Sequence, residues 1–117
     1  TMTYDEFRKA MDAWWSATDA REVARKNSQG ALLALIEMYE GLEPDGRVLA
    51  DQVVAEWIGS ENDRKRFDAL ALVDRFRIRA AAAQLRIAET EIAARRDHEA
   101  PYELAKVRRI LDRLADG

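Results

Sequence analysis

Residues 45–92 read DGRVLADQVVAEWIGSENDRKRFDALALVDRFRIRAAAAQLRIAETEI. Apolar residues recur along this stretch at helical spacing, and short polar turns interrupt them twice. The stretch therefore predicts helix, tight turn, helix, tight turn, helix. It contains neither histidine nor cysteine, so it says much about architecture and little about activity.

Extending this reasoning outward predicts six helices. Thr3 and Glu6 have the spacing of a capping box at the start of the first helix, and Pro101 suits the first turn of the last. Gly59 is expected to end the third helix in the left-handed conformation. The expected ranges are 4–16, 21–40 with a kink or break near Asn27–Gly30, 47–58, 62–77, 79–96 and 102–115.

Further expectations concern caps and buried positions. Asp19 with Glu22 is expected to cap the second helix, and Ser60 with Asp63 the fourth. The end of the second helix, residues 32–39, is apolar almost all round, which favours a position between neighbours. Apolar spacing places four residues of the fourth helix inside: Phe67, Leu70, Val73 and Phe76.

Length and composition place these helices in one domain. The chain has 117 residues, of which 48% are hydrophobic and 35% charged, and it has no cysteine. These values are typical of a folded soluble domain without disulfides. The fold class expected is all-α, with about six antiparallel helices joined by short loops into three helical hairpins. Either a compact bundle or a short α-solenoid fits that description.

Ser60–Leu85 resembles the second half of a HEAT repeat and the start of the next. An acidic turn leads into a helix with a basic residue near its start and an Ala-Leu core pair, and a second short turn follows. The resemblance, which covers about residues 45–92, implies a protein-binding scaffold. Some small bacterial proteins built this way are immunity proteins, which inhibit a cognate toxin. The matching positions are Asp63, Arg66, Ala69, Leu70, Val73, Ile78, Ala82 and Leu85.

A search for catalytic groups favours a non-enzyme. His98 is the only histidine and lies in a polar turn, and neither glycine-rich nucleotide-binding pattern is present. We therefore expect no catalytic residue, no metal site and no cofactor. No run of about 18 apolar residues and no leader pattern occur, so we expect a cytoplasmic protein without a membrane span.

The charge is unevenly distributed. Residues 1–60 hold 6 basic and 11 acidic side chains, net −5, whereas residues 61–117 hold 13 basic and 11 acidic ones, net +2. The basic residues of the second half alternate with aspartates, which indicates ion pairs within the protein and argues against a nucleic-acid surface. The acidic half favours a basic protein partner, such as a toxin or a regulator.

Aromatic and acidic residues of the first half are the candidate binding surface. Trp14 and Trp15 project about 100° apart on a helix, so either both are core residues or one contacts a partner or a second copy of the chain. A homo-oligomeric structural or regulatory domain is therefore the alternative function, and small-ligand or nucleic-acid binding is a lesser one. The candidate partner-binding residues are Trp14, Trp15, Asp12, Asp19, Glu37 and Glu40.

Overall fold

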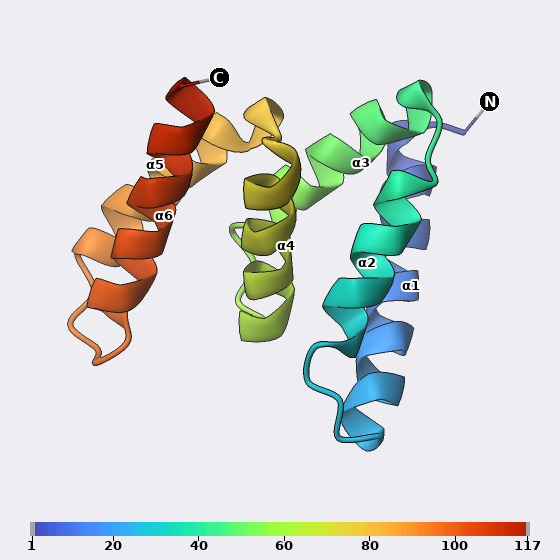
Figure 1. Cartoon of the computed structure of the whole chain (residues 1–117), viewed down its shortest axis with the longest axis horizontal. Helices are drawn as coiled ribbons and strands as arrows, with labels where there is room; N and C mark the ends of the chain where they lie inside the picture. Colours follow the sequence, from blue (N-terminus) through green and yellow to red (C-terminus); the bar gives the residue numbers. More distant parts are fainter. Residues whose placement is uncertain (1, 117) are drawn as a thin grey trace. The chain divides into compact units, whose positions relative to one another are not determined.

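A computed structural model describes residues 2–116 of the chain (Figure 1). All regular structure in this range is helical, which confirms the all-α prediction. The helices fall into two compact units, an N-terminal unit that ends at Val53 and a C-terminal unit that begins at Val54. The helices are α1 (Tyr4–Ala24), α2 (Gly30–Glu40), α3 (Pro44–Trp57), α4 (Asp63–Phe76), the short 3-10 helix η1 (Arg79–Ala81), α5 (Ala82–Ala93) and α6 (Ala100–Ala115).

In the N-terminal unit, α1 and α2 pack side by side as a hairpin (Figure 1). The capping box at the start of α1 is confirmed: the Thr3 N–H donates to Glu6 Oε1 over 3.0 Å, and the Glu6 N–H donates to Thr3 Oγ1 over 3.2 Å. Burial of large side chains from both helices supplies most of the stabilisation of such a pair. Those that are buried include Met11, Trp15, Leu35 and Tyr39.

The first helix is longer than the sequence predicted. It continues to Ala24, so the expected end at Ser16 and the cap at Asp19 are wrong. Residues 17–24 contain neither glycine nor proline, and Asp19 is buried within the helix. The expected break near Asn27–Gly30 is confirmed: α1 ends where Lys26 adopts φ 60°, a left-handed conformation that stops a helix.

A glycine lets the second helix start close to the first. A Cβ at Gly30 would lie only 2.5 Å from Cγ of Glu22. Glu22 in turn accepts a hydrogen bond of 3.3 Å from the Asn27 side chain. Because glycine has no Cβ, the backbone of α2 can begin against this side chain.

The helix α3 begins at Pro44, three residues before the expected start, because proline fits the first turn of a helix. Arg47 on α3 donates a 3.0 Å hydrogen bond to the carbonyl of Glu40, and its guanidinium lies 5.2 Å from the ring centroid of Tyr39. Tyr39 donates a hydrogen bond to Asp51. These contacts join the end of α2 to α3.

In the C-terminal unit, α5 and α6 pack side by side as a second hairpin, and α4 contacts α6 (Figure 1). The core of this unit includes Leu70, Leu85, Val107 and Ile110. Two of the three predicted hairpins are thus present. The third, α3 with α4, spans the border between the two units and stays a prediction, as do the single domain and the choice between bundle and solenoid.

Several local predictions for this unit are wrong. Gly59 does not adopt a positive φ. Asn62, not Ser60, caps α4, because its side chain accepts a 3.1 Å hydrogen bond from the Lys65 N–H. Arg77 adopts φ 52° and ends α4. The fifth helix is divided into η1 and α5 and ends at Ala93, whereas Pro101 lies in the first turn of α6 as expected.

The apolar residues of the fourth helix divide differently from the prediction. Leu70 and Val73 are buried as expected, and Leu72 joins them. Phe67 is 46% exposed, so its expected place in the core is wrong. Its ring instead lies 5.1 Å from the ammonium of Lys106 on α6, a contact that partly shields an aromatic face without burying it. Leu33 on α2 is also exposed, so α2 is not covered on all sides.

Candidate partner-binding groove

An apolar groove lies between α1 and the end of α2 in the N-terminal unit. It has a volume of about 250 Å³. The α1 side spans two helical turns, about 10 Å, and the other side is formed by Met38 in the last turn of α2 and by Leu42, two residues beyond the end of that helix. Every side chain that lines it is apolar. The lining residues are Met2, Phe7, Ala10, Met11, Trp14, Met38 and Leu42.

All three methionines of the chain line this groove. Met11 is buried on α1, Met38 is half-buried on α2, and Met2, which precedes α1, is 52% exposed. Methionine has three rotatable bonds and a polarizable thioether, so it adapts its shape to what it contacts. A groove with this lining is suited to accept apolar side chains of varied shape.

Acidic residues stand next to lining residues of the groove on both helices. Glu6 precedes Phe7 on α1 and Glu37 precedes Met38 on α2, so each projects about 100° round its helix from a lining residue. Both are exposed, and Glu6 keeps its negative charge while it caps α1. The Thr3 hydrogen bonds lower the pKa of Glu6. The groove therefore has a carboxylate along each of its two helices.

The nearby basic residues of α1 do not neutralise these carboxylates. Arg8 binds Asp5 over 2.9 Å and Lys9 binds the same carboxylate over 3.3 Å. These two hydrogen bonds, together with the charge of the Lys9 ammonium, lower the pKa of Asp5. Lys9 directly precedes the lining residue Ala10, but its ammonium binds Asp5.

One of the six predicted binding residues, Trp14, lines the groove, and a second, Glu37, directly precedes the lining residue Met38. Trp15 is only 2% exposed and Asp19 only 6% exposed, so their prediction as contact residues is corrected: both side chains are part of the interior. Neither Asp12 nor Glu40 lines the groove, although Asp12 directly follows the lining residue Met11. A contact role for these two at another surface stays a prediction.

Sequence reasoning missed the other lining residues as binding residues. Phe7 and Met11 fall at helical spacing, which indicates an apolar face of the first helix and not a groove. Met38 and Leu42 come from another helix and the turn after it, and nothing in the sequence fixes which residues of α2 face those of α1. The three methionines lie far apart in the sequence and meet only when the hairpin closes, so the sequence alone does not show that they line one groove.

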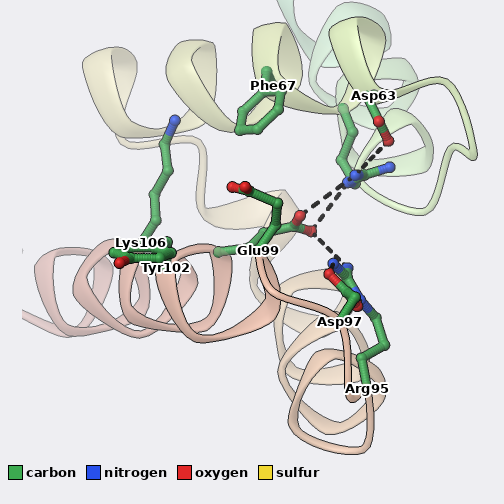
Figure 2. Close-up of a pocket in the computed structure, with 9 residues that line it drawn as sticks. Asp63, Phe67, Arg95, Asp97, Glu99, Tyr102 and Lys106 are labelled. Atoms are coloured by element: carbon green, nitrogen blue, oxygen red, sulfur yellow. Dashed lines mark hydrogen bonds and ion pairs between the residues drawn. The ribbon is translucent and has the colours of Figure 1, made fainter.

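A second hollow, of about 340 Å³, lies in the C-terminal unit between α4, the α5–α6 turn and α6 (Figure 2). At its centre is Glu103, only 6% exposed. Glu103 Oε2 accepts hydrogen bonds from Arg66 Nε at 3.1 Å and from Arg95 Nη1 at 3.3 Å. Arg66 also binds Asp63 at 2.8 Å, and Arg95 binds Asp97 at 2.6 Å.

The charged side chains around Glu103 form an ion cluster in which each cation binds a carboxylate of the same cluster. A hydrogen bond from Arg95 lowers the pKa of Asp97 to about 2, and the hydrogen bond to Asp97 raises the pKa of Arg95. Burial alone would lower the pKa of Arg66, but hydrogen bonds to Asp63 and Glu103 outweigh it and raise the pKa. Because these side chains already bind one another, the cluster is better suited to join α4, the α5–α6 turn and α6 than to bind a ligand.

No group of histidine, cysteine or acidic side chains suited to hold a metal ion occurs within residues 2–116. His98 is exposed, and its ring packs edge-on against Tyr102 with a centroid distance of 6.4 Å. None of the helices described is long and apolar enough to cross a membrane. Comparison of the chain with protein-family models, curated proteins and solved structures finds no significant match.

Proposed function

We propose that this protein is a non-catalytic binding module whose groove holds the apolar face of an α-helix from another protein. The observation that carries the proposal is the groove lined by Phe7, Trp14 and all three methionines. Contiguous exposed apolar surface on a small protein marks an interaction site, and adaptable methionines are common where helices dock in grooves.

The dimensions of the groove suit a helix. Phe7 and Trp14 are seven residues apart on α1, which separates them by about 10 Å along the helix axis. An amphipathic helix presents its apolar residues at positions i, i+3, i+4 and i+7, over the same length. A docked helix can therefore place two successive turns of apolar side chains along the groove. Trp14 is the best anchor, since tryptophan is enriched among residues that dominate binding energy.

An immunity-type inhibitor is one protein of this class. The resemblance of residues 45–92 to HEAT-like repeats supports a scaffold that binds proteins, and the acidic N-terminal half supports a basic partner such as a toxin. The groove proposal concerns only the class of partner, and it does not depend on the partner being a toxin.

The test compares a filled groove with an intact one. Ala10→Trp places a large side chain on the groove without removing a core residue, and Ala20→Trp makes the same change at an exposed position of α1 outside the lining. The probe is a set of labelled 18-residue helical peptides that share one apolar face, followed by fluorescence anisotropy. We expect saturable binding that Ala10→Trp weakens at least tenfold and Ala20→Trp leaves within twofold.

The homo-oligomer alternative gives a different result. If the groove is an interface between two copies of the chain, light scattering shows a dimer that Ala10→Trp dissociates, and the peptides bind only at concentrations that compete with the dimer. A monomer that binds none of the peptides contradicts both the helix-binding proposal and this alternative.

A further inference from the structure

We infer that the groove selects helices with a basic polar face; this rests on the proposed function and adds the chemistry of the partner. The first observation is the charge of the N-terminal unit. Residues 1–53 hold 10 acidic and 6 basic side chains. A surface with this imbalance attracts a positively charged partner and repels a negatively charged one.

The basic side chains of this unit are mostly engaged elsewhere. Arg8 and Lys9 bind Asp5, and Arg47 holds the carbonyl of Glu40. Arg21 and Arg25 lie within 3.9 Å and 3.7 Å of the Glu22 carboxylate. In these contacts the cations bind Asp5, Glu22 and the carbonyl of Glu40, and none of the contacts is to the side chain of Glu6 or Glu37.

Acidic side chains at the C-terminal end of α2 interact unfavourably with the helix dipole. Its last turn includes Glu37 and Glu40, and α2 has no basic residue in that turn. Within the described part of the chain, neither carboxylate forms an ion pair, and the same is true of Glu43 just beyond. A helix C-terminus carries partial negative charge, so acidic groups there are destabilising and a cation is stabilising. Arg47 already places one cation at the carbonyl of Glu40, but it binds neither carboxylate, so a partner that brings a cation beside Glu37 adds a favourable interaction.

Glu37 and Glu6 have the position to act on a docked helix. Both are exposed, and each directly precedes a lining residue, Glu6 before Phe7 on α1 and Glu37 before Met38 on α2. A helix with its apolar face in the groove directs its flanking residues to both edges. Lysine or arginine at those flanking positions then meets a carboxylate on each side, whereas glutamate meets a like charge. Charge pairs at the rim of an interface act mainly on specificity and association rate.

The experiment uses three labelled 18-residue helical peptides with the same leucine and phenylalanine face and with lysine, glutamine or glutamate at the remaining positions. A fourth peptide has the lysine composition in scrambled order, without an apolar face. Dissociation constants for the full chain are measured at 50 mM and 300 mM salt. We expect the lysine peptide to bind at least tenfold more tightly than the glutamine peptide at low salt, with the glutamate peptide weakest. The difference is expected to shrink at high salt because exposed charges are screened.

Two charge reversals locate the effect. Glu37→Lys reverses a charge at the edge of the groove and is expected to reduce the lysine preference at least threefold. Glu40→Lys makes the same change in the same helical turn, but at a residue that is not adjacent to a lining residue, and is expected to have a much smaller effect. Equal effects of the two variants contradict recognition at the groove edge and indicate net charge alone.

The outcomes separate the inference from the proposed function. Equal binding of all three ordered peptides, lost in Ala10→Trp, overturns the charge selection but leaves the helix-binding groove standing. Equally tight binding of the scrambled lysine peptide overturns the groove as the site of recognition. The absence of binding by every peptide overturns both.

Discussion

The hydroxyl of Tyr39 on α2 donates a hydrogen bond of 2.7 Å to Oδ1 of Asp51 on α3. Burial raises the pKa of Tyr39, and hydrogen bonding to Asp51 raises it further. Burial also raises the pKa of Asp51, although the hydrogen bond from Tyr39 and the charge of Arg47 lower it in part. The hydrogen bond between the two side chains therefore offsets part of the free-energy cost of burying each of them.

We predict that Tyr39→Phe lowers the free energy of unfolding by about 1–3 kcal/mol, because it leaves the Asp51 carboxylate half-buried without its donor. The change removes one oxygen and leaves the packing of the ring. Urea unfolding of the single and double variants with Asp51→Ala measures the coupling. If Tyr39→Phe costs the same in both backgrounds, the hydrogen bond does not contribute to stability.

The burial of Asp51 predicts a particular pH dependence. Its pKa is raised in the folded state, so the folded protein binds the proton more tightly than the unfolded chain, and this contribution to stability is lost as the pH rises above the ordinary value of 3.8. Asp51→Asn keeps an acceptor for Tyr39 and removes the titration. We expect it to flatten that part of the stability curve measured by urea unfolding between pH 3 and 7. An unchanged slope contradicts the raised pKa.

The pKa of Asp97 is shifted in the opposite direction, so its contribution to stability has the opposite pH dependence. Its pKa is lowered to about 2 by Arg95, so the stability it contributes is fully present above its ordinary pKa of 3.8 and is lost as the pH falls from about 4 to about 2. We expect Asp97→Asn to lower stability at pH 7 and to reduce the acid sensitivity of thermal unfolding in that window. Glu99→Gln, at an exposed neighbouring position that also lines the hollow, is the control. Acid unfolding that is identical in wild type and Asp97→Asn contradicts the role of this pair.

Much of the fold could be predicted because local signals agree with it. Apolar spacing gave the number and order of helices, and the Thr3–Glu6 spacing gave the start of the first. The wrong predictions concern residues whose type fits two different environments in a protein. Asp19 has a cap-like spacing, yet it is a buried helical residue, and Phe67 is apolar, yet it contacts a lysine from α6 and stays exposed. Both depend on contacts between helices, which spacing along one helix does not contain.

The groove was only partly predictable for the same reason. Trp14 and Glu37 were singled out, but Trp14 and Trp15 have the same type and adjacent positions, and only packing against α2 decides which is covered. The lining residues Met38 and Leu42 are 24 or more positions from Trp14, so their meeting is a property of how the hairpin closes. The Arg66–Glu103 pair, 37 residues apart, is equally invisible in the sequence.

The ion cluster around Glu103 predicts a large cost for its removal. We expect Glu103→Ala to lower the free energy of unfolding by about 3 kcal/mol, the lower end of the range for a broken buried pair, because Arg66 and Arg95 each keep an aspartate. Glu89→Ala removes the partner of Arg108, a more exposed pair, and is expected to cost about 0–1 kcal/mol. Equal costs in thermal or urea unfolding contradict a structural role for the cluster.

The three tryptophans allow the groove to be observed directly. Trp14 lies half-buried at the groove, whereas Trp15 and Trp57 are buried. We expect acrylamide to quench wild-type emission mainly through Trp14, so Trp14→Phe loses the quenchable component. Binding of the lysine peptide should shift the emission of the wild type to shorter wavelength, as Trp14 leaves water, and should leave Trp14→Phe unshifted. Trp57→Phe is the control and is expected to retain the shift. A shift that persists in Trp14→Phe means that the peptide binds somewhere other than the groove.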